Sequence, residues 1–224
     1  KVIFDIGGGI PNGKKFKAVQ IGGPSGGATT ASDEHLDLPL DFDSLKSAGA
    51  MVGSGGLVVM NQQTCMPAVA KFFMRFTQNE SCGKCVPCRE GTKQMLALLD
   101  DITKGNADEN TLALLEETAK AAQMGSLCGL GKTAPNPILS TLRHFRDEYE
   151  THVKNKRCPA GQCKALAVPE ILADKCRGCT VCAKKCPVGA ISGALKQPHK
   201  IDVDKCIRCG ACKTACKFGA VTGL

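Results

Sequence analysis

The C-terminal part of the chain carries one cysteine pattern twice. Both copies have the spacing Cys-x2-Cys-x2-Cys-x3-Cys and lie 30 residues apart. The two copies are Cys176, Cys179, Cys182, Cys186 and Cys206, Cys209, Cys212, Cys216. This spacing is typical of ferredoxins with two [4Fe-4S] clusters. Three thiolates on one tight loop reach three corners of an iron-sulfur cube, and the loop cannot bend round to the fourth corner.

The fourth ligand of each cube must therefore come from the other copy. The predicted ligand sets are Cys176, Cys179, Cys182 and Cys216 for one cluster, and Cys206, Cys209, Cys212 and Cys186 for the other. The flanks repeat too, since Asp174-Lys175 matches Asp204-Lys205, and this indicates an internal duplication. Two zinc sites or a disulfide framework are the alternatives, but neither needs a crossed fourth cysteine at identical offsets.

Four helices are predicted between residues 64 and 152, because apolar residues recur there at helical spacing. The stripes are Val69, Phe72, Phe73, Phe76; Met95, Leu96, Leu99, Ile102; Leu112, Leu115, Ala119, Ala122; and Ile138, Leu142, Phe145, Tyr149. Gly105 is placed to end the second helix, and Asp108 to cap the third. We interpret the stripes as core faces of an antiparallel four-helix bundle.

The connections between these helices carry a third group of cysteines. Cys82, Cys85 and Cys88 have x2 spacing between the first two helices, and Cys128 lies between the last two. In an up-down-up-down bundle the first and third connections lie at the same end, so topology brings Cys128 to the other three. We expect a third [4Fe-4S] cluster there, with zinc as the alternative.

Three of the 15 cysteines remain: Cys65, Cys158 and Cys163. Cys65 opens the first helix, and the other two follow the fourth helix just after His152, which puts all four at the opposite end of the bundle. Three thiolates and one imidazole make a closed structural zinc site. Free thiols, another metal, or a His152 that only caps its helix C-terminus are the alternatives. Surface or core roles are expected for His35, His144 and His199.

The first 60 residues are predicted to form a small β-rich segment. Strand-like runs at 16–21 and 57–60 lie between glycine clusters. Gly22 and Gly27 have the gap of a phosphate-binding loop, but Ala28 stands where the lysine belongs, so turn glycines are the better interpretation. The chain opens on an apolar run without an initiator methionine. We therefore expect it to be a fragment of a longer protein.

The composition argues against a secreted protein, a membrane-spanning protein and a nucleic-acid-binding protein. No signal peptide opens the chain, and its most apolar stretch, 48–60, is broken by four glycines, so we expect neither secretion nor a membrane span. Cysteines this dense then indicate metal ligands in a reducing compartment, by default the cytoplasm. Residues 151–224 hold 14 Lys+Arg against 4 Asp+Glu. This basic excess offsets cluster charge and could serve an acidic redox partner, whereas nucleic acid is disfavoured because no aromatic platform accompanies it.

Three segments, 17–27, 80–92 and 126–149, resemble the C-terminal half of the FMN- and NADH-binding flavoprotein subunit of respiratory complex I. The motif at 81–91, Ser-Cys-Gly-Lys-Cys-x-Pro-Cys-Arg-Glu-Gly, is highly specific. With the appended double ferredoxin, the chain is similar to the beta subunits of soluble, NAD(P)-linked, electron-bifurcating [FeFe] hydrogenases and related formate dehydrogenases. The resemblance implies that Cys82, Cys85, Cys88 and Cys128 hold the cluster nearest the flavin.

The same resemblance implies an α+β multidomain fold and supplies the expected cofactors and partners. The expected parts are an incomplete β-grasp (SLBB) segment at 1–62, the iron-sulfur four-helix bundle at 63–152, a metal-binding hinge at 153–165 and a 2[4Fe-4S] ferredoxin-like domain at 166–224. FMN and NAD(P) belong to a domain absent from this chain. Expected partners are a hydrogenase-type catalytic subunit and a thioredoxin-like [2Fe-2S] subunit, with ferredoxin as a further candidate.

These observations predict the electron-relay half of an NAD(P)-linked oxidoreductase subunit, with three [4Fe-4S] clusters, a structural zinc ion and no catalytic residue of its own. The charged neighbours of the cysteines, Lys175, Arg177, Lys205 and Arg208, are expected to help set the potentials. Alternatives are the equivalent subunit of a formate dehydrogenase or transhydrogenase complex, a stand-alone ferredoxin-like carrier or adaptor, and a purely structural metal scaffold.

Overall fold

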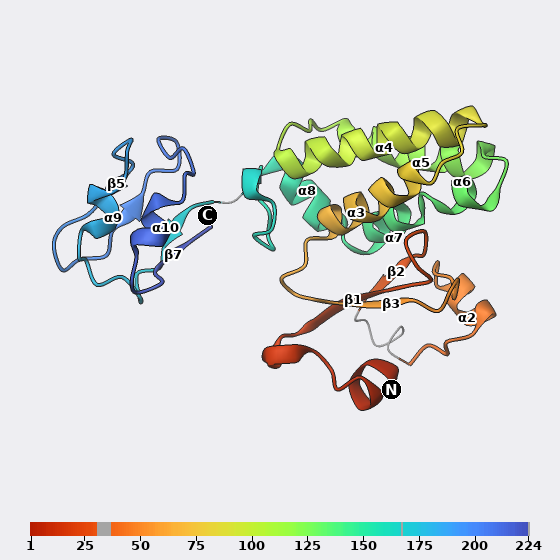
Figure 1. Cartoon of the computed structure of the whole chain (residues 1–224), viewed down its shortest axis with the longest axis horizontal. Helices are drawn as coiled ribbons and strands as arrows, with labels where there is room; N and C mark the ends of the chain where they lie inside the picture. Colours follow the sequence, from red (N-terminus) through yellow and green to blue (C-terminus); the bar gives the residue numbers. More distant parts are fainter. Residues whose placement is uncertain (31–36, 167, 224) are drawn as a thin grey trace. The chain divides into compact units, whose positions relative to one another are not determined.

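The computed structural model describes residues 1–30, 37–166 and 168–223, so His35 lies outside the described residues. The chain divides into two compact units, Lys1–Cys163 and Lys164–Leu224 (Figure 1). The division falls inside the segment 153–165 that the sequence predicts as a hinge. Within the described ranges, no helix has both the length and the apolar character that crossing a bilayer requires.

The first unit opens with irregular turns and a small antiparallel sheet. Its elements are η1 (Val2–Ile6), η2 (Pro11–Gly13), β1 (Phe16–Ile21), β2 (Ala28–Thr30), α2 (Phe42–Ser47) and β3 (Leu57–Asn61), and the strand order is β2-β1-β3. In the central strand, Val19 pairs with Thr29 on one side and with Val59 on the other. Glycine is required beside β1, because a Cβ on Gly22, at φ +91°, would lie 2.4 Å from the carbonyl oxygen of Met51.

In the first unit, six helices follow the sheet. They are α3 (Met66–Asn79), α4 (Val86–Lys104), α5 (Thr111–Gly125), α6 (Gly129–Thr133), α7 (Asn136–His144) and α8 (Arg146–Lys154). Gly105 ends α4 in the left-handed conformation, at φ +85°. The Oδ1 atom of Asp108 accepts a hydrogen bond of 2.9 Å from the backbone N–H of Thr111, which opens α5.

The predicted fourth helix is wrong as a single element. At Phe145 the backbone takes φ −134° and ψ 35°, so the chain leaves the helical conformation between α7 and α8. The hydroxyl groups of Thr141 and Tyr149 lie 2.7 Å apart across this break, and both side chains are buried. The break thus lets the two helices bury a hydrogen-bonded pair of polar groups between them.

The predicted core stripe of the first helix is also partly wrong. Phe72 and Phe76 are 72% and 47% exposed, and the buried face of α3 includes Ala70, Phe73 and Thr77. Phe73 is buried, whereas Phe72, about 100° away around the helix, lies outside the buried face. Thr77 belongs to the buried face because its hydroxyl donates to the carbonyl oxygen of Met74, at 3.0 Å.

The main core lies between α3, α4, α5, α7 and α8, which pack against one another. Its fully buried members include Met74, Met95, Leu99, Ile102, Leu115, Ile138 and Tyr149. The helix α7 also packs against strand β2, and the hydroxyl of Ser140 accepts a hydrogen bond of 2.9 Å from the backbone N–H of Ala28. The sheet and the helices therefore belong to one folded unit.

The second unit repeats one small motif. After η3 (Lys164–Leu166) come β4 (Glu170–Ile171), α9 (Val181–Lys184) and β5 (Ile191–Ser192), followed by β6 (Lys200–Ile201), α10 (Ala211–Ala215) and β7 (Val221–Thr222). Each element of the first copy begins 30 residues before its counterpart. The strands pair crosswise and antiparallel, β4 with β7 and β5 with β6. Each of these ladders therefore joins one strand of the first copy to one strand of the second.

Candidate metal centres

Four cysteines of the helical part line one cavity of about 100 Å³, here called the helical cavity. They are Cys82 and Cys85 before α4, Cys88 in its first turn and Cys128 directly before α6. Glycine is needed where α6 meets α4, because a Cβ on Gly131 would lie 2.5 Å from the side chain of Ser126 and 3.0 Å from the Cβ of Cys88. This close approach brings Cys128 to the α4 cysteines.

The loop of the helical cavity favours thiolates. Backbone hydrogen bonds, first from Leu127 and then from Cys88, lower the pKa of the Cys85 thiol. Thiolate is the form that ligates metals. The guanidinium of Arg89 donates a hydrogen bond of 2.7 Å to the carbonyl oxygen of Gly83, which holds the loop to α4.

The second unit has two further cysteine-lined cavities. Cavity I is lined by Cys176, Cys179, Cys182 and Cys216. Cavity II is lined by Cys206, Cys209, Cys212 and Cys186. The structure therefore brings together the two crossed sets that the spacing predicts. Burial raises the pKa values of the Cys182 and Cys212 thiols, so a metal bound there must supply positive charge to hold them as thiolates.

Backbone N–H groups point at several of these sulfurs. The N–H groups of Ala190 and Ala220 lie 3.3 and 3.4 Å from the Sγ atoms of Cys186 and Cys216, at equivalent positions of the two copies. Such donors stabilise thiolate charge and help to set cluster potential. The loops reach this geometry through left-handed residues, among them Thr180 at φ 62° and Arg208 at φ 55°. Backbone strain at non-glycine residues is typical of functional sites.

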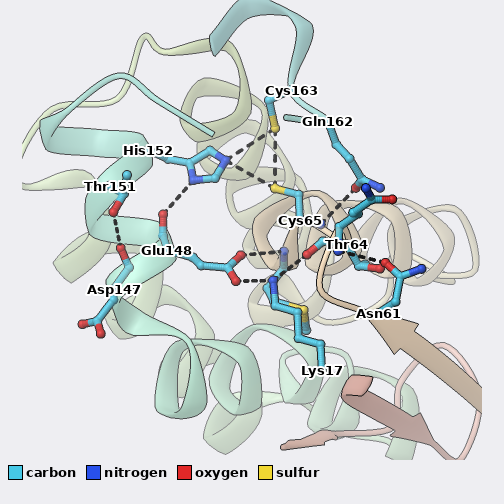
Figure 2. Close-up of polar contacts among 12 residues, drawn as sticks. Lys17, Asn61, Thr64, Cys65, Asp147, Glu148, Thr151, His152, Gln162 and Cys163 are labelled. Atoms are coloured by element: carbon cyan, nitrogen blue, oxygen red, sulfur yellow. Dashed lines mark hydrogen bonds and ion pairs between the residues drawn. The ribbon is translucent and has the colours of Figure 1, made fainter. Parts of the chain in front are cut away.

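The remaining three cysteines, Cys65, Cys158 and Cys163, meet His152 in a separate buried group, here called the Cys3His site. Figure 2 shows Cys65, Cys163 and His152 of this group. Cys65 directly precedes α3, His152 lies in α8, and Cys158 and Cys163 follow α8. All four side chains are buried, and their ligand atoms lie within 4.8 Å of one another. Among the residues that the structure describes, this is the single group of three or more possible metal ligands that is so compact.

The distances in the Cys3His site fit one tetrahedral ion. The Sγ atoms of Cys65 and Cys163 are 3.6 Å apart, and they lie 3.3 and 3.5 Å from the Nε2 atom of His152. With Zn–S of about 2.3 Å and Zn–N of about 2.05 Å, a tetrahedral zinc ion separates two sulfurs by about 3.8 Å and a sulfur from a nitrogen by about 3.6 Å. These three separations lie within about 0.3 Å of the values for a tetrahedral zinc ion, so the residues present fit zinc.

Surrounding hydrogen bonds orient these ligands. The Nδ1 atom of His152 donates to the carbonyl oxygen of Glu148 at 2.6 Å, which leaves Nε2 toward the sulfurs. The carboxylate of Glu148 in turn pairs with Lys17 and accepts from the backbone N–H of Met66 at 3.2 Å. The backbone N–H of Cys65 donates to the Oε1 atom of Gln162 at 3.0 Å. Partners of this kind are typical of structural metal sites.

The electrostatics of the Cys3His site favour a bound cation. Hydrogen bonds of Cys158 and Cys163, and then burial, raise the pKa of Cys65, whereas hydrogen bonds of Cys163 and Cys65 lower that of Cys158. Burial by itself lowers the pKa of His152, but hydrogen bonds of Cys158 and Cys65 outweigh it and raise the value to about 10. Three touching thiols can all ionise only beside a metal ion.

Sequence reasoning missed one residue at these centres. His199 lines cavity I together with the cysteines, its side chain is buried, and its backbone N–H lies 3.5 Å from the Sγ of Cys176. It follows Cys176 by 23 residues, so local spacing does not reveal the contact. Among the charged neighbours, Arg177 lines cavity I, and the guanidinium of Arg208 donates to the carbonyl oxygen of Ala165.

Known families match both parts of the chain. Residues 68–152 match the family described as the NADH-ubiquinone oxidoreductase-F iron-sulfur binding region. Residues 168–217 match the 4Fe-4S dicluster domain. These two matched segments contain all twelve cysteines of the helical cavity, cavity I and cavity II.

Individual relatives agree with these matches. The chain is 53% identical over 199 residues to the NADP-reducing hydrogenase subunit HndC of Solidesulfovibrio fructosivorans, covering 89% of this chain and 40% of that protein. It is 39% identical over 165 residues to an NADH-quinone oxidoreductase subunit of Streptomyces coelicolor, covering 74% and 36%. The chain therefore spans about two fifths of the length of these curated relatives.

A solved structure is similar as well. An NAD+-reducing [NiFe]-hydrogenase in the H2-reduced state matches with a TM-score of 0.57 and 33% sequence identity, over 63% of this chain and 24% of that chain. The same hydrogenase in the air-oxidized state matches equally well.

Proposed function

We propose that this chain relays electrons within an NAD(P)-linked oxidoreductase, because residues 68–152 match the NADH-ubiquinone oxidoreductase-F iron-sulfur binding region and residues 168–217 match the 4Fe-4S dicluster domain. Its cysteines hold the redox groups, and no residue of the chain makes or breaks a substrate bond. One observation carries the proposal: twelve of the 15 cysteines fall into three groups of four, and each group lines its own cavity.

In this proposal each cavity holds one [4Fe-4S] cluster. The ligand sets are Cys82, Cys85, Cys88, Cys128; Cys176, Cys179, Cys182, Cys216; and Cys206, Cys209, Cys212, Cys186. The distances between the sulfur atoms support a cluster over a single zinc ion in each cavity. No three of these sulfurs lie as close together as the ligand atoms of the Cys3His site. Sulfurs around one zinc ion would lie about 3.8 Å apart. When bound, the clusters supply one-electron chemistry.

The Cys3His site is proposed to hold a structural zinc ion. Cys65, His152, Cys158 and Cys163 satisfy a tetrahedral ion that has no redox chemistry of its own. Its role here is mechanical, because it ties the start of α3 to the end of α8 and to the segment that leads to the second unit. Because Cys158 and Cys163 lie within the predicted hinge at 153–165, the ion would hold that segment to the helices as far as Cys163. Any flexible connection would begin after Cys163, and it would allow the ferredoxin-like unit to serve more than one redox partner.

For the whole protein we favour a subunit of an electron-bifurcating hydrogenase that is linked to NADP or NAD. The similarity to HndC, whose name describes an NADP-reducing hydrogenase subunit, supports this choice. FMN and NAD(P) would be further cofactors of the whole protein, and a hydrogenase-type catalytic subunit and a thioredoxin-like [2Fe-2S] subunit would be its partners. The equivalent subunit of a formate dehydrogenase or transhydrogenase complex is the second candidate.

The test combines metal analysis with EPR during a reductive titration of the purified chain. Three cubes require about twelve iron atoms per chain and three distinguishable reduced signals. An iron content near eight, with zinc in the helical cavity, would contradict the assignment of Cys82, Cys85, Cys88 and Cys128. Clusters that no biological reductant can reduce would instead favour a structural scaffold.

A further inference from the structure

One lysine of the small sheet reaches two of the segments that carry ligands of the Cys3His site. Lys17 lies in β1, the central strand of the sheet, and its side chain is 14% exposed. Its ammonium group donates a hydrogen bond of 2.6 Å to the carbonyl oxygen of Thr64 and forms an ion pair with the carboxylate of Glu148 (Figure 2). Thr64 directly precedes Cys65, and Glu148 lies four residues before His152. A single cation therefore contacts the neighbours of two different ligands.

The contact with Thr64 fixes the peptide group that leads into Cys65. The carbonyl oxygen of Thr64 and the backbone N–H of Cys65 belong to one planar peptide group. Lys17 donates to the oxygen of this group, and the N–H of the same group donates to the Oε1 atom of Gln162 at 3.0 Å. Because the Cα atom of Cys65 lies in this plane, the two hydrogen bonds limit where its thiol can point.

The contact with Glu148 acts on the second ligand. The carboxylate of Glu148 also accepts a hydrogen bond of 3.2 Å from the backbone N–H of Met66, the first residue of α3. The backbone carbonyl oxygen of Glu148, in α8, orients the ring of His152. The ion pair with Lys17 therefore holds the residue that joins the two helices on which Cys65 and His152 depend.

The setting of this ion pair makes the lysine hard to replace. The side chains of Lys17 and Glu148 are 14% and 15% exposed, and the ammonium lies 5.6 Å from the centre of the Phe145 ring. Solvent screens charges weakly at that degree of burial. Removal of the lysine would leave a largely buried carboxylate without its cation, which is unfavourable unless the carboxylate moves. Such a movement would disturb the start of α3, and with it Cys65.

We propose that Lys17 is a positioning residue of the Cys3His site and that it makes the sheet part of the metal centre. The inference rests on the proposed occupancy of this site by zinc. Lys17 acts through Thr64 and Glu148 and not on the ion itself. Loss of such an outer partner typically lowers metal affinity about 10–100-fold. The coupling is reciprocal, so binding of zinc should in turn strengthen the attachment of β1 to the helices.

The test measures the affinity of the purified chain for zinc in competition with a chelating dye, with iron content recorded for every sample. Lys17→Met removes the ammonium group and keeps a side chain of similar length. We expect it to raise the dissociation constant of zinc at least about tenfold. Lys17→Arg keeps a cation and should lose less affinity than Lys17→Met. Lys15→Met is the matched control, since Lys15 is exposed and lies just before β1, and it should leave the affinity unchanged.

A second variant keeps the test decisive if Lys17→Met does not fold. Glu148→Gln removes the negative partner of Lys17 but leaves the backbone carbonyl group that orients His152. It should weaken zinc binding by a smaller factor than Lys17→Met, because the amide oxygen of glutamine still accepts hydrogen bonds.

Two further readouts separate positioning from a purely structural role. A structural role would lower the free energy of unfolding equally with and without zinc, whereas positioning lowers it more when zinc is present. Hydrogen exchange of the backbone amides at 16–21 should be slower with zinc bound, and Lys17→Met should abolish that difference.

Several outcomes would overturn the inference. They are an unchanged zinc dissociation constant in both Lys17→Met and Glu148→Gln, an equal loss of stability with and without zinc, an exchange rate at 16–21 that does not respond to zinc, and a loss of affinity in Lys15→Met as large as that in Lys17→Met. An unsubstituted chain that binds no zinc would instead refute the proposed content of the Cys3His site.

Discussion

The Nδ1 atom of His152 lies 2.6 Å from the backbone carbonyl oxygen of Glu148, one helical turn earlier in α8. The carboxylate of the same Glu148 reaches back to Lys17 and to the N-terminus of α3. A single residue of α8 therefore orients the imidazole through its backbone and holds the neighbouring helix start through its side chain. This arrangement presets the Cys3His site before any metal arrives.

The first prediction concerns zinc at that site. His152→Ala should remove zinc and lower the free energy of unfolding of the first unit by about 2.7 kcal/mol, the value expected when free zinc stands 100-fold above its dissociation constant. Metal analysis and chemical unfolding followed by far-UV circular dichroism measure the two effects. Lys154→Ala, an exposed change in the same helix, is the control and should keep the metal.

Anomalous scattering on both sides of the zinc absorption edge checks the ligands directly. A zinc peak should lie within bonding distance of all four side chains. The proposal fails if no peak lies near Cys158 and Cys163, and a peak without Cys65 or His152 would correct the ligand set.

The second prediction separates the cluster of the helical cavity from the ferredoxin pair. Cys128→Ser should remove one of three EPR signals and about four iron atoms per chain, because a cube needs all of its thiolates. The other two signals should persist, since Cys128 belongs to a different compact unit from cavities I and II. Simultaneous loss of all three signals would show that the units do not fold independently.

The third prediction uses two glycines of α6. Gly131→Ala should destabilise the first unit by about 1–3 kcal/mol and reduce iron in the helical cavity, because the new Cβ would press on Ser126 and Cys88. Gly129→Ala is the matched control, since a Cβ there meets nothing within 4 Å. Unfolding midpoints and iron analysis of both variants decide the matter. Equal behaviour of the two variants would contradict the close approach of α6 and α4.

The fourth prediction concerns the hydrogen bond across the break between α7 and α8. Tyr149→Phe should lower the free energy of unfolding by about 1 kcal/mol, the usual net contribution of one buried hydrogen bond. The loss stays moderate because the hydroxyl of Thr141 also donates to the carbonyl oxygen of Pro137, at 2.6 Å. Urea unfolding followed by far-UV circular dichroism reports mainly on this helical unit. A change of less than a few tenths of a kcal/mol would mean that the pair contributes nothing to stability.

Several features could be predicted from the sequence because their determinants are local. The 30-residue offset predicts which fourth cysteine joins each set of three, and the structure does place each set of four around one cavity. The spacing also predicts [4Fe-4S] clusters, which stays a prediction. Strand β1 and the end of α4 at Gly105 also follow from local patterns, namely a run of strand-forming residues and a glycine that tolerates positive φ. Twelve of the 15 cysteines are assigned to the three cavities, so Cys65, Cys158 and Cys163 remain as candidate ligands of another metal. The structure brings these three to His152.

Other features were decided by the tertiary structure alone. The core face of α3 leaves out Phe72 and includes Thr77, whose hydroxyl is hydrogen-bonded within its own helix. The break at Phe145 places the hydroxyl of Tyr149, in α8, 2.7 Å from that of Thr141, in α7. His199 reaches cavity I only because the β5-β6 pairing folds its segment back onto the first copy's cysteines. The spacing of cysteines along the chain determines which metal group a loop can bind. Packing between segments that are distant in the sequence determines which other side chains surround that metal group.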